Sequence, residues 1–568
     1  MLLSIYLVTF LFWLFLLYKD LKYKRIFIRS SSKNVLPLFF LVVVILLLLH
    51  FSYFTDIIFY NGGFKIRNTL LTETSFHLGI INMMKDMYPP LFPYASGHDF
   101  SHYHLNMHLE IEMFYRFFSI DTLKLTYFYF PLLYFVLLIF IPYSFIKRNF
   151  NSQFLGIFTC MLFFGSDLSF IPELFDISSG KPWIFSTTIW SLMTLNGYLP
   201  SLFIMFLFIF YMKEYNENGR GSYLIILSFL GYSAYGFKSS MGPHLIATAL
   251  LTGIVSVFLF QDKKKWIHFC TAMTISAVAI ILELSTFMAK SVDVLDFDML
   301  NGLRRSLTML GYSQVSWLLL SLIFPLYLLC VYGARSFGFY LIKGCFNKKS
   351  FDPVLFFIIF FSISGFLVAE IVYIGPPEHE VNKAYFFAEQ SFMCAWILFP
   401  YLFSRISRNW KKYLLTIAVV MTAFPTSVHF FVLRSANIYH TVDSDAIEVT
   451  EYLKSTPVGS TVLHPPIHPD EIGPSLASNF AGRPSVINLF LSFTPDWIGE
   501  KEHLERTRDI VVFFNPYDSI KRSVILNKYK VDYVYAPSAY ADILSQESML
   551  TMKLKNKSYV VYKVNSNK

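Results

Sequence analysis

The sequence predicts a polytopic α-helical membrane protein of about 12 transmembrane helices. It also predicts a large first outer loop with interfacial helices and a C-terminal soluble α/β domain. Of the 568 residues, 55% are hydrophobic and only 15% are charged, and the mean hydropathy is +0.50. A soluble globular domain carries about 25% charged residues. The composition therefore excludes a purely soluble enzyme, a disordered chain and a fibrous repeat.

The transmembrane helices are predicted from apolar runs, because crossing about 30 Å of hydrocarbon takes about 20 helical residues. The first run follows Met1 directly and has neither a basic start nor a small-residue cleavage site. We therefore expect it to be a retained helix and not a removed signal peptide. The runs lie at 2–18, 35–54, 124–146, 152–170, 197–212, 222–236, 242–260, 266–284, 311–331, 352–374, 384–404 and 412–432.

The orientation follows from lysine and arginine, which gather in alternate loops. These loops hold 21 Lys and Arg against 5 Asp and Glu, whereas the other loops and the spans up to residue 432 hold 11 against 18. Short basic loops stay in the cytoplasm. We therefore expect an inner-membrane protein whose first large loop and tail face outward. The net charge of +9 is then a topology signal, and a nucleic-acid partner is not expected. The basic loops are 19–34, 147–153, 213–221, 261–266, 332–352 and 404–412.

The outer loop at 55–123 is too long for a simple connection, and such loops usually have a role. Apolar residues recur at helical spacing in 76–84, and a Pro-Pro break at Pro89 and Pro90 separates this stretch from a second one rich in histidine and aromatic residues. We expect two short helices on the membrane surface.

The tail changes to an ordinary mixed composition, which predicts two domains, 1–432 in the membrane and 433–568 outside it. Helical patterns alternate with strand-like runs, as in a small α/β domain. No GxGxxG, GxxxxGK[ST], HExxH or GxSxG motif occurs there, so we expect the tail to bind or shield. The helical patterns are 444–455, 498–509 and 517–528, and the strand-like runs are 461–463, 485–489, 510–514, 532–535 and 558–564.

Several motifs in the outward-facing parts carry a resemblance when they are taken in order. Stretch 73–104 has an acid, a histidine four residues on, a Pro-Pro break and a Tyr-His pair. It resembles the first outer loop of polyprenyl-phosphate-sugar-dependent GT-C membrane glycosyltransferases, a superfamily that includes protein mannosyltransferases. The further motifs are FGSDLSF at 164–170, NGYLPSL at 196–202, VNKAYFF with its asparagine and tyrosine at 381–387, AGRPSV at 481–486 and KYKVDYVYAP at 528–537.

The resemblance implies an inverting transfer of a sugar from a polyprenyl-phosphate donor to a glycan, lipid or protein acceptor among membrane lipids. In that family a carboxylate at the start of the first outer loop deprotonates or orients the acceptor, and this role falls on Glu73, where aspartate is usual. A second acid often helps to bind a divalent metal such as Mg²⁺ or Mn²⁺, and this role falls most plausibly on Asp167. Glu283, Glu370 and Glu389 are the alternatives for the second acid.

The physical chemistry of the loop residues allows these roles beside plainer ones. A carboxylate at a membrane interface can have a raised pKa, as a general base needs, although Glu73 could also only favour a helix start. His77 would share its helical face and bind a phosphate, orient the carboxylate or simply sit at the interface. Tyr103 and His104 are expected to bind substrate. The histidine cluster could hold a metal or form hydrogen bonds to substrate; its members are His98, Asp99, His102, His104 and His108.

A lipid phosphate needs cations at the outer headgroup level. Arg304 and Arg305 are the first choice because they adjoin a long outer segment, and Lys238 in GFKSSMGPH follows. Each of these side chains could instead only snorkel to the headgroups. The remaining candidates are Lys383, Lys65 and Arg67.

Two other functions remain open from the sequence. A transporter or lipid flippase usually has paired internal repeats and midplane charges, and no convincing repeat is visible. A non-catalytic glycan-assembly protein would use the loop and tail only for recognition.

Overall fold

The computed structural model of the protein describes most of the chain beyond residue 56. The predicted spans at 2–18 and 35–54 lie outside the described residues, as does most of the loop that follows Asp167. The described residues are 57–60, 62–98, 100, 105–168, 197–259, 262–288, 294–309, 312, 315–345, 351–375, 382–435, 439–466, 475–489, 494–515 and 519–565.

Seven helices in the described part are long and apolar enough to cross a membrane, and each overlaps a predicted span, although Trp317–Cys345 continues into the predicted basic loop at 332–352. The chain is therefore a mostly helical, multi-pass membrane protein. The seven are Thr122–Phe150, Tyr198–Asn218 (α10), Met241–Leu259 (α12), Lys263–Ser285 (within α13, Lys263–Met288), Trp317–Cys345, Pro353–Ile371 (α17) and Tyr385–Arg405.

Three other predicted spans are helical but shorter or less apolar, so a total of about 12 stays a prediction. They are α7 (Gln153–Leu162), α11 (Gly221–Phe237) and α20 (Asn409–Ser435). Three of the seven spans, Thr122–Phe150 among them, comprise more than one helical element. Trp317–Cys345 comprises α15 (Trp317–Tyr332), the 3-10 helix Gly333–Leu341 and α16 (Ile342–Cys345), and Tyr385–Arg405 comprises α18 (Tyr385–Ala395) and α19 (Leu398–Arg405).

The first described span begins at an aspartate cap. Asp121 Oδ1 accepts hydrogen bonds from the N–H groups of Leu123 (3.0 Å) and Lys124 (3.3 Å), which satisfies donors that a helix start leaves unpaired. The span runs through α5 (Thr122–Lys124), a π-helical turn at Leu125–Tyr129 and α6 (Phe130–Phe150).

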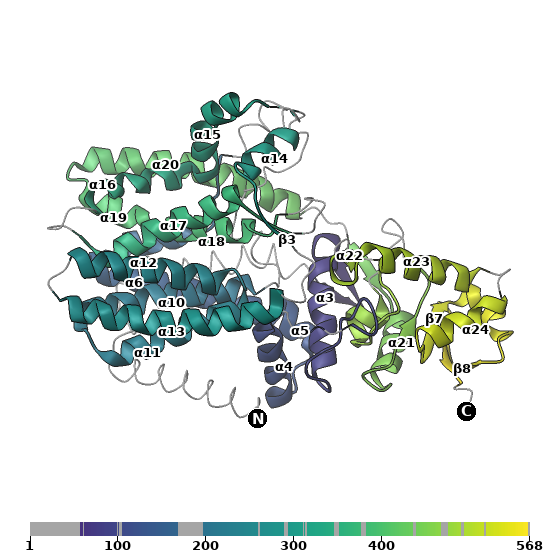
Figure 1. Ribbon diagram of the computed structural model, residues 1–568. Coiled ribbons are helices and arrows are strands. Elements are labelled where there is room, and N and C mark those ends of the chain that lie inside the picture. Colours follow the sequence, from purple (N-terminus) through teal and green to yellow (C-terminus); the bar gives the residue numbers. More distant parts are fainter. Residues whose placement is uncertain are drawn as a thin grey trace.

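A second part of the fold combines the first loop with the tail, which are far apart in sequence. Strands β1 (Ile57–Tyr60) and β2 (Gly63–Arg67) form a hairpin, and β5 (Tyr439–Val442) of the tail pairs antiparallel with β2. Figure 1 places the loop helices α3 (Asn68–Met84) and α4 (Asn106–Phe118) between the helical body and the tail. The tail is thus joined to the first loop by backbone hydrogen bonds.

The tail also has its own four-stranded sheet of order β6-β7-β9-β8, in which only β6 and β7 are parallel. The prediction of a strand at 510–514 is wrong, because these residues form the last turn of α23. The division at residue 432 stays a prediction. The tail elements are β6 (Val462–Leu463), β7 (Tyr533–Pro537), β8 (Leu550–Lys555), β9 (Tyr559–Val564), α21 (Ser444–Lys454), α22 (Thr494–Ile498), α23 (Glu500–Phe514), α24 (Ser519–Lys528) and α25 (Ala541–Ser545).

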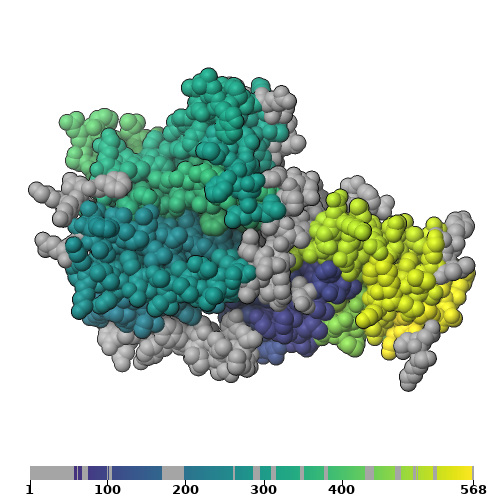
Figure 2. All heavy atoms as spheres, in the orientation of Figure 1, coloured from purple at the N-terminus to yellow at the C-terminus, as the bar shows by residue number. Residues whose placement is uncertain are grey.

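A close backbone contact holds α3 against the tail at a π-helical turn, Leu476–Ala481. A Cβ atom on Gly79 would lie 2.0 Å from the carbonyl oxygen of Ser478, so only glycine allows this approach. One turn further along α3, Asn82 Nδ2 donates to the carbonyl of Phe480 at 2.7 Å. Figure 2 likewise shows the first-loop atoms lying against the tail.

Candidate active site

The two loop helices meet through a pair of buried histidines. His77 Nδ1 and His108 Nε2 are hydrogen-bonded at 2.8 Å, and burial lowers the pKa of His108 to about 3, so this imidazole is neutral at physiological pH. Glu73 lies four residues before His77 in α3, about one helical turn away. The side chain of Glu73, and both Tyr103 and His104, lie outside the described part of the chain.

Helix α4 then connects this pair to the helical body. A Cβ on Gly236 of α11 would lie 2.1 Å from Asn106 Nδ2, so the start of α4 touches the end of α11. Further along α4, the Tyr134 hydroxyl of α6 donates to Glu110. Burial raises the pKa of Glu110 to about 7, and this hydrogen bond opposes the shift. A carboxyl group that titrates near neutrality is a candidate for acid–base work.

Lys238, a predicted phosphate ligand, ends α11 just beyond this contact and is buried. Its Nζ lies 3.7 Å from the ring centre of Phe386 and 4.3 Å from that of Tyr198. These rings come from the starts of α18 and α10, so three helix ends meet around one cation. Aromatic faces attract the ammonium group without neutralising its charge.

The predicted pair Arg304 and Arg305 lies on α14 (Asn301–Met309). The guanidinium of Arg305 lies 5.7 Å from the Tyr385 ring centre, while Arg304 forms an ion pair with Asp298 and lies 5.7 Å from the Trp317 ring centre. A hollow of about 570 Å³ opens beside both arginines, and we name it the cation hollow. It is lined by Asp296, Phe297, Asp298, Asn301, Arg304, Arg305 and Thr308.

A network of amide groups fixes α14 against the start of α18. Asn301 Oδ1 accepts from the Tyr385 hydroxyl at 2.9 Å and from Asn382 Nδ2 at 3.3 Å. Asn382 also accepts from the N–H groups of Ile374 (3.0 Å) and Ala384 (2.9 Å) through Oδ1. Its neighbour, the predicted ligand Lys383, lies in the same turn. Residues 382–386 therefore bring Lys238, Arg304, Arg305 and Lys383 to one side of the helical body.

Asp167, the predicted metal ligand, has a different environment. It is buried, its carbonyl accepts from Thr426 Oγ1 at 2.9 Å, and it interacts electrostatically with the buried Arg335. Gly333 approaches it closely, because a Cβ there would lie 3.2 Å from the Asp167 Cα. Within the described ranges, no three His, Cys, Asp or Glu side chains converge as metal ligands would.

The two histidines of the cluster that the structure describes, His98 and His108, contact different partners. His98 Nε2 is hydrogen-bonded to Glu502 Oε1 at 3.0 Å, and Arg506 Nη2 donates to the same oxygen at 2.6 Å. Burial opposes the effect, but these two partners hold the pKa of Glu502 below its usual range. His98 thus ties the loop to α23 of the tail, whereas His108 faces His77. Asp99, His102 and His104 are outside the described residues.

Three functional candidates are absent from the sequence-based set. Glu110 looks like any polar residue of an amphipathic helix until its contact with α6 is known. Asn301 lies in a segment, 294–309, that contains no motif. Asn479 donates to Ser75 Oγ at 2.6 Å and to the Tyr94 hydroxyl, and so joins the tail to the loop two residues beyond Glu73. Its position in SNFAGRPSV, next to a motif that carries the resemblance, is the one signal that could have identified it.

Comparisons with known proteins give structural matches only. No family model and no curated protein matches the sequence. The archaeal oligosaccharyltransferase AglB from Archaeoglobus fulgidus, in complex with an inhibitory peptide and a dolichol-phosphate, matches with 11% identity and a TM-score of 0.46 over 90% of this chain and 70% of that chain. The Archaeoglobus fulgidus oligosaccharyltransferase tethered to an acceptor peptide matches with 11% identity and a TM-score of 0.47. The match covers 93% of this chain and 74% of that chain.

ArnT from Cupriavidus metallidurans, bound to undecaprenyl phosphate, matches with 11% identity and a TM-score of 0.45 over 94% of this chain and 99% of that chain. These proteins are multi-pass membrane glycosyltransferases of the GT-C type, which is the class that the sequence motifs resemble.

Proposed function

We propose that this protein is an inverting glycosyltransferase of the GT-C type, working at the outer face of the inner membrane. It would move a sugar from a polyprenyl-phosphate donor to a glycan, lipid or protein acceptor. The proposal includes about 12 membrane helices, a large first outer loop at 55–123 and an outer C-terminal domain.

The observation that carries the proposal is the gathering of cations around the start of α18. Phosphate oxygens are bound best by guanidinium groups, with ammonium groups as point charges. Arg305 and Lys238 rest on the rings of Tyr385 and Phe386, at 5.7 Å and 3.7 Å from the ring centres. Aromatic contacts orient these cations at the start of α18. The cation hollow provides space for a lipid phosphate beside the two arginines.

In the proposed reaction the acceptor hydroxyl attacks the anomeric carbon from the face opposite the phosphate. The new bond joins the acceptor oxygen to the sugar, and the old sugar–phosphate bond breaks with its electron pair remaining on the polyprenyl phosphate. The acceptor proton passes to the Glu73 carboxylate, which acts as general base. Arg304 and Arg305 stabilise the charge of the leaving phosphate.

A divalent metal remains a prediction that the described donor groups do not support. Asp167 interacts with Arg335, and its described surroundings do not offer the several oxygen donors that Mg²⁺ needs. No step of the proposed reaction is therefore assigned to a metal.

The test is the substitution Glu73→Gln, which keeps the size of the side chain and removes the base. Purified protein in lipid nanodiscs is incubated with radiolabelled undecaprenyl-phosphate-linked hexoses and with membrane and cell-envelope fractions as acceptors. We expect the variant to lose about 10²- to 10⁴-fold in rate, as for other general bases, with an unchanged unfolding temperature. Glu73→Asp, which restores the residue usual in the family, should retain transfer.

Glu500→Gln is the matched control, because Glu500 is an exposed acid at the start of a tail helix. It should transfer at the wild-type rate. Transfer by Glu73→Gln at the wild-type rate would remove Glu73 from the mechanism, and failure of every donor to react with the wild-type protein would overturn the proposed function.

A further inference from the structure

A second hollow lies between the first loop and the tail, and we name it the hairpin pocket. Its volume is about 550 Å³, within the range of roughly 300–1,000 Å³ that is usual for small-molecule sites. The β1–β2 hairpin, α3, the start of α5, α21 and the π-helical turn all contribute to its wall. It opens on the face of α3 that carries Leu78 and Asn82, whereas His77 faces α4.

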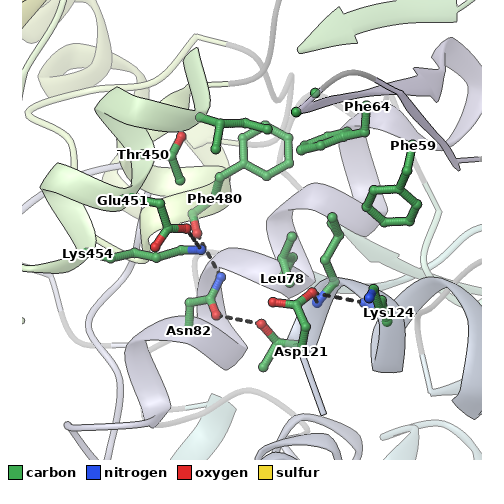
Figure 3. A pocket seen from close by; sticks show the side chains of 15 residues that line it. Phe59, Phe64, Leu78, Asn82, Asp121, Lys124, Thr450, Glu451, Lys454 and Phe480 are labelled. Atoms are coloured by element: carbon green, nitrogen blue, oxygen red, sulfur yellow. Dashed lines mark hydrogen bonds and ion pairs between the residues drawn. The ribbon is translucent and has the colours of Figure 1, made fainter. Parts of the chain in front are cut away.

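Phenylalanine rings form one side of the hairpin pocket. Phe64 and Phe480 are buried, with ring centres 5.6 Å apart, and Phe59 lies 6.2 Å from Phe64 with half of its surface exposed. Figure 3 shows these three rings together along one side of the cavity. A half-exposed ring next to two buried ones presents an apolar face to whatever enters.

Charged and amide groups form the other side, and their charges balance. Two carboxylates, Asp121 and Glu451, face two lysines, Lys124 and Lys454. Lys454 Nζ donates to Glu451 Oε1 at 2.7 Å, and Asp121 Oδ1 caps α5.

This arrangement discriminates between classes of ligand. A lipid chain would desolvate both carboxylates and add no hydrogen bond to them, which is costly. A phosphate or an acidic sugar would meet two carboxylates and two lysines, without the arginine fork that binds phosphate best. A pyranose ring fits both sides, because its C–H face suits the negative face of a phenyl ring and its hydroxyl groups donate to carboxylates and accept from lysine.

We propose that the hairpin pocket is a binding site for a neutral oligosaccharide, separate from the reaction centre. One sugar ring stacks on Phe59, and its hydroxyl groups bond to Asp121, Glu451 and Lys124. Because the wall includes α21 and the π-helical turn of the tail, the site is complete only when the tail is docked on α3. The inference goes beyond the proposed transfer reaction, since the bound glycan need not be the one that reacts.

The experiment uses the full chain in nanodiscs and a panel of neutral linear oligosaccharides built from glucose, galactose, mannose and N-acetylglucosamine. Binding is measured by saturation-transfer NMR and calorimetry. We expect at least one member to bind, and Phe59→Ala to weaken it about 5-fold or more, since loss of an aromatic stacking partner typically costs at least this much. Glu451→Gln should weaken it about 10-fold, as expected for a hydrogen bond to a charged group.

Phe117→Ala is the matched control, because Phe117 is a similarly exposed phenylalanine (53%) on α4 outside the pocket. It should bind as the wild-type protein does. Glu73→Gln should also keep full glycan binding, which separates this proposal from the proposed function. The proposal is overturned if no neutral glycan binds, if Phe59→Ala and Phe117→Ala behave alike, or if a sulfated glycan or undecaprenyl phosphate is the ligand that Phe59→Ala loses.

Discussion

The cation hollow beside α14 and the hairpin pocket under the tail have similar volumes, about 570 Å³ and 550 Å³, and each is lined by two acidic and two basic side chains, but the cations are held differently. In the first, Arg305 rests on the ring of Tyr385, while Arg304 is paired with Asp298. In the second, the charge of Lys454 is compensated by Glu451. The partner of each cation, and not the size of the cavity, therefore decides which ligand it suits.

The two hollows also depend on different contacts in separate parts of the fold. The cation hollow belongs to the helical body, where Asn301 and Asn382 fix α14 to α18. The hairpin pocket exists only where α3 meets the tail at Gly79 and Ser478. A change at one contact should therefore leave the other hollow intact, and this independence can be tested.

The largest effect is expected from the double substitution Arg304→Ala and Arg305→Ala. Each hydrogen bond to a charged group is worth about 1.5–3 kcal/mol, so the loss of two should weaken binding of undecaprenyl phosphate about 100-fold or more. Native mass spectrometry of the protein in nanodiscs measures this binding. Oligosaccharide binding in the hairpin pocket should change less than 2-fold.

Arg508→Ala serves as the control, because Arg508 is 74% exposed on a tail helix. The assignment of the lipid phosphate to the cation hollow is contradicted if the double variant binds undecaprenyl phosphate as the wild-type protein does. It is also contradicted if Arg508→Ala weakens this binding equally.

The next effect concerns the contact between α3 and the tail. Gly79→Ala places a Cβ about where the carbonyl oxygen of Ser478 lies, and such overpacking typically costs about 1–3 kcal/mol. We expect faster limited proteolysis of the tail and about 10-fold weaker oligosaccharide binding, with unchanged binding of undecaprenyl phosphate. Gly221→Ala, where a Cβ meets nothing within 4 Å, is the control. Equal loss of both ligands would show that the two hollows are not independent.

The smallest effect is a pH dependence at the contact between the loop and the body. Burial raises the pKa of Glu110 to about 7, above its value in the unfolded chain, so the folded state binds more protons between these two values. Stability from this group is therefore present at low pH and is lost as the pH rises toward 7. Glu110→Gln should remove this pH-dependent loss of stability. The unfolding temperature of the variant at pH 8 should exceed that of the wild-type protein by about 2 °C or more.

At pH 5 the two proteins should differ less, since Glu110 is then protonated. Glu500→Gln should follow the wild-type profile at both pH values. A constant difference between Glu110→Gln and the wild-type protein from pH 5 to pH 8 would contradict the raised pKa.

The sequence predicted the spans better than the site, for a physical reason. Spans follow from local composition, and seven of them are confirmed as helices long and apolar enough to cross a membrane. The strand expected at 510–514 failed because a β-branched apolar run is ambiguous. Ile510, Phe513 and Phe514 are buried at i, i+3 and i+4, which is helical spacing.

The site could be predicted only as a set of separate residues. The sequence marks Lys238, Arg304 and Lys383 as outer cations, but nothing local indicates that they gather at one helix start. Asn301 and Glu110 acquire their importance from contacts with residues 81 and 24 positions away, Asn382 and Tyr134. Long-range contacts of this kind leave no periodic pattern in a single sequence.

A density map of the protein in nanodiscs containing undecaprenyl phosphate tests the central claim most directly. The account predicts a phosphate within hydrogen-bond reach of Arg304 or Arg305 in the cation hollow, with an open path from it to Glu73 and no lipid density in the hairpin pocket. Phosphate density that lies in the hairpin pocket, or that touches neither arginine, would contradict it.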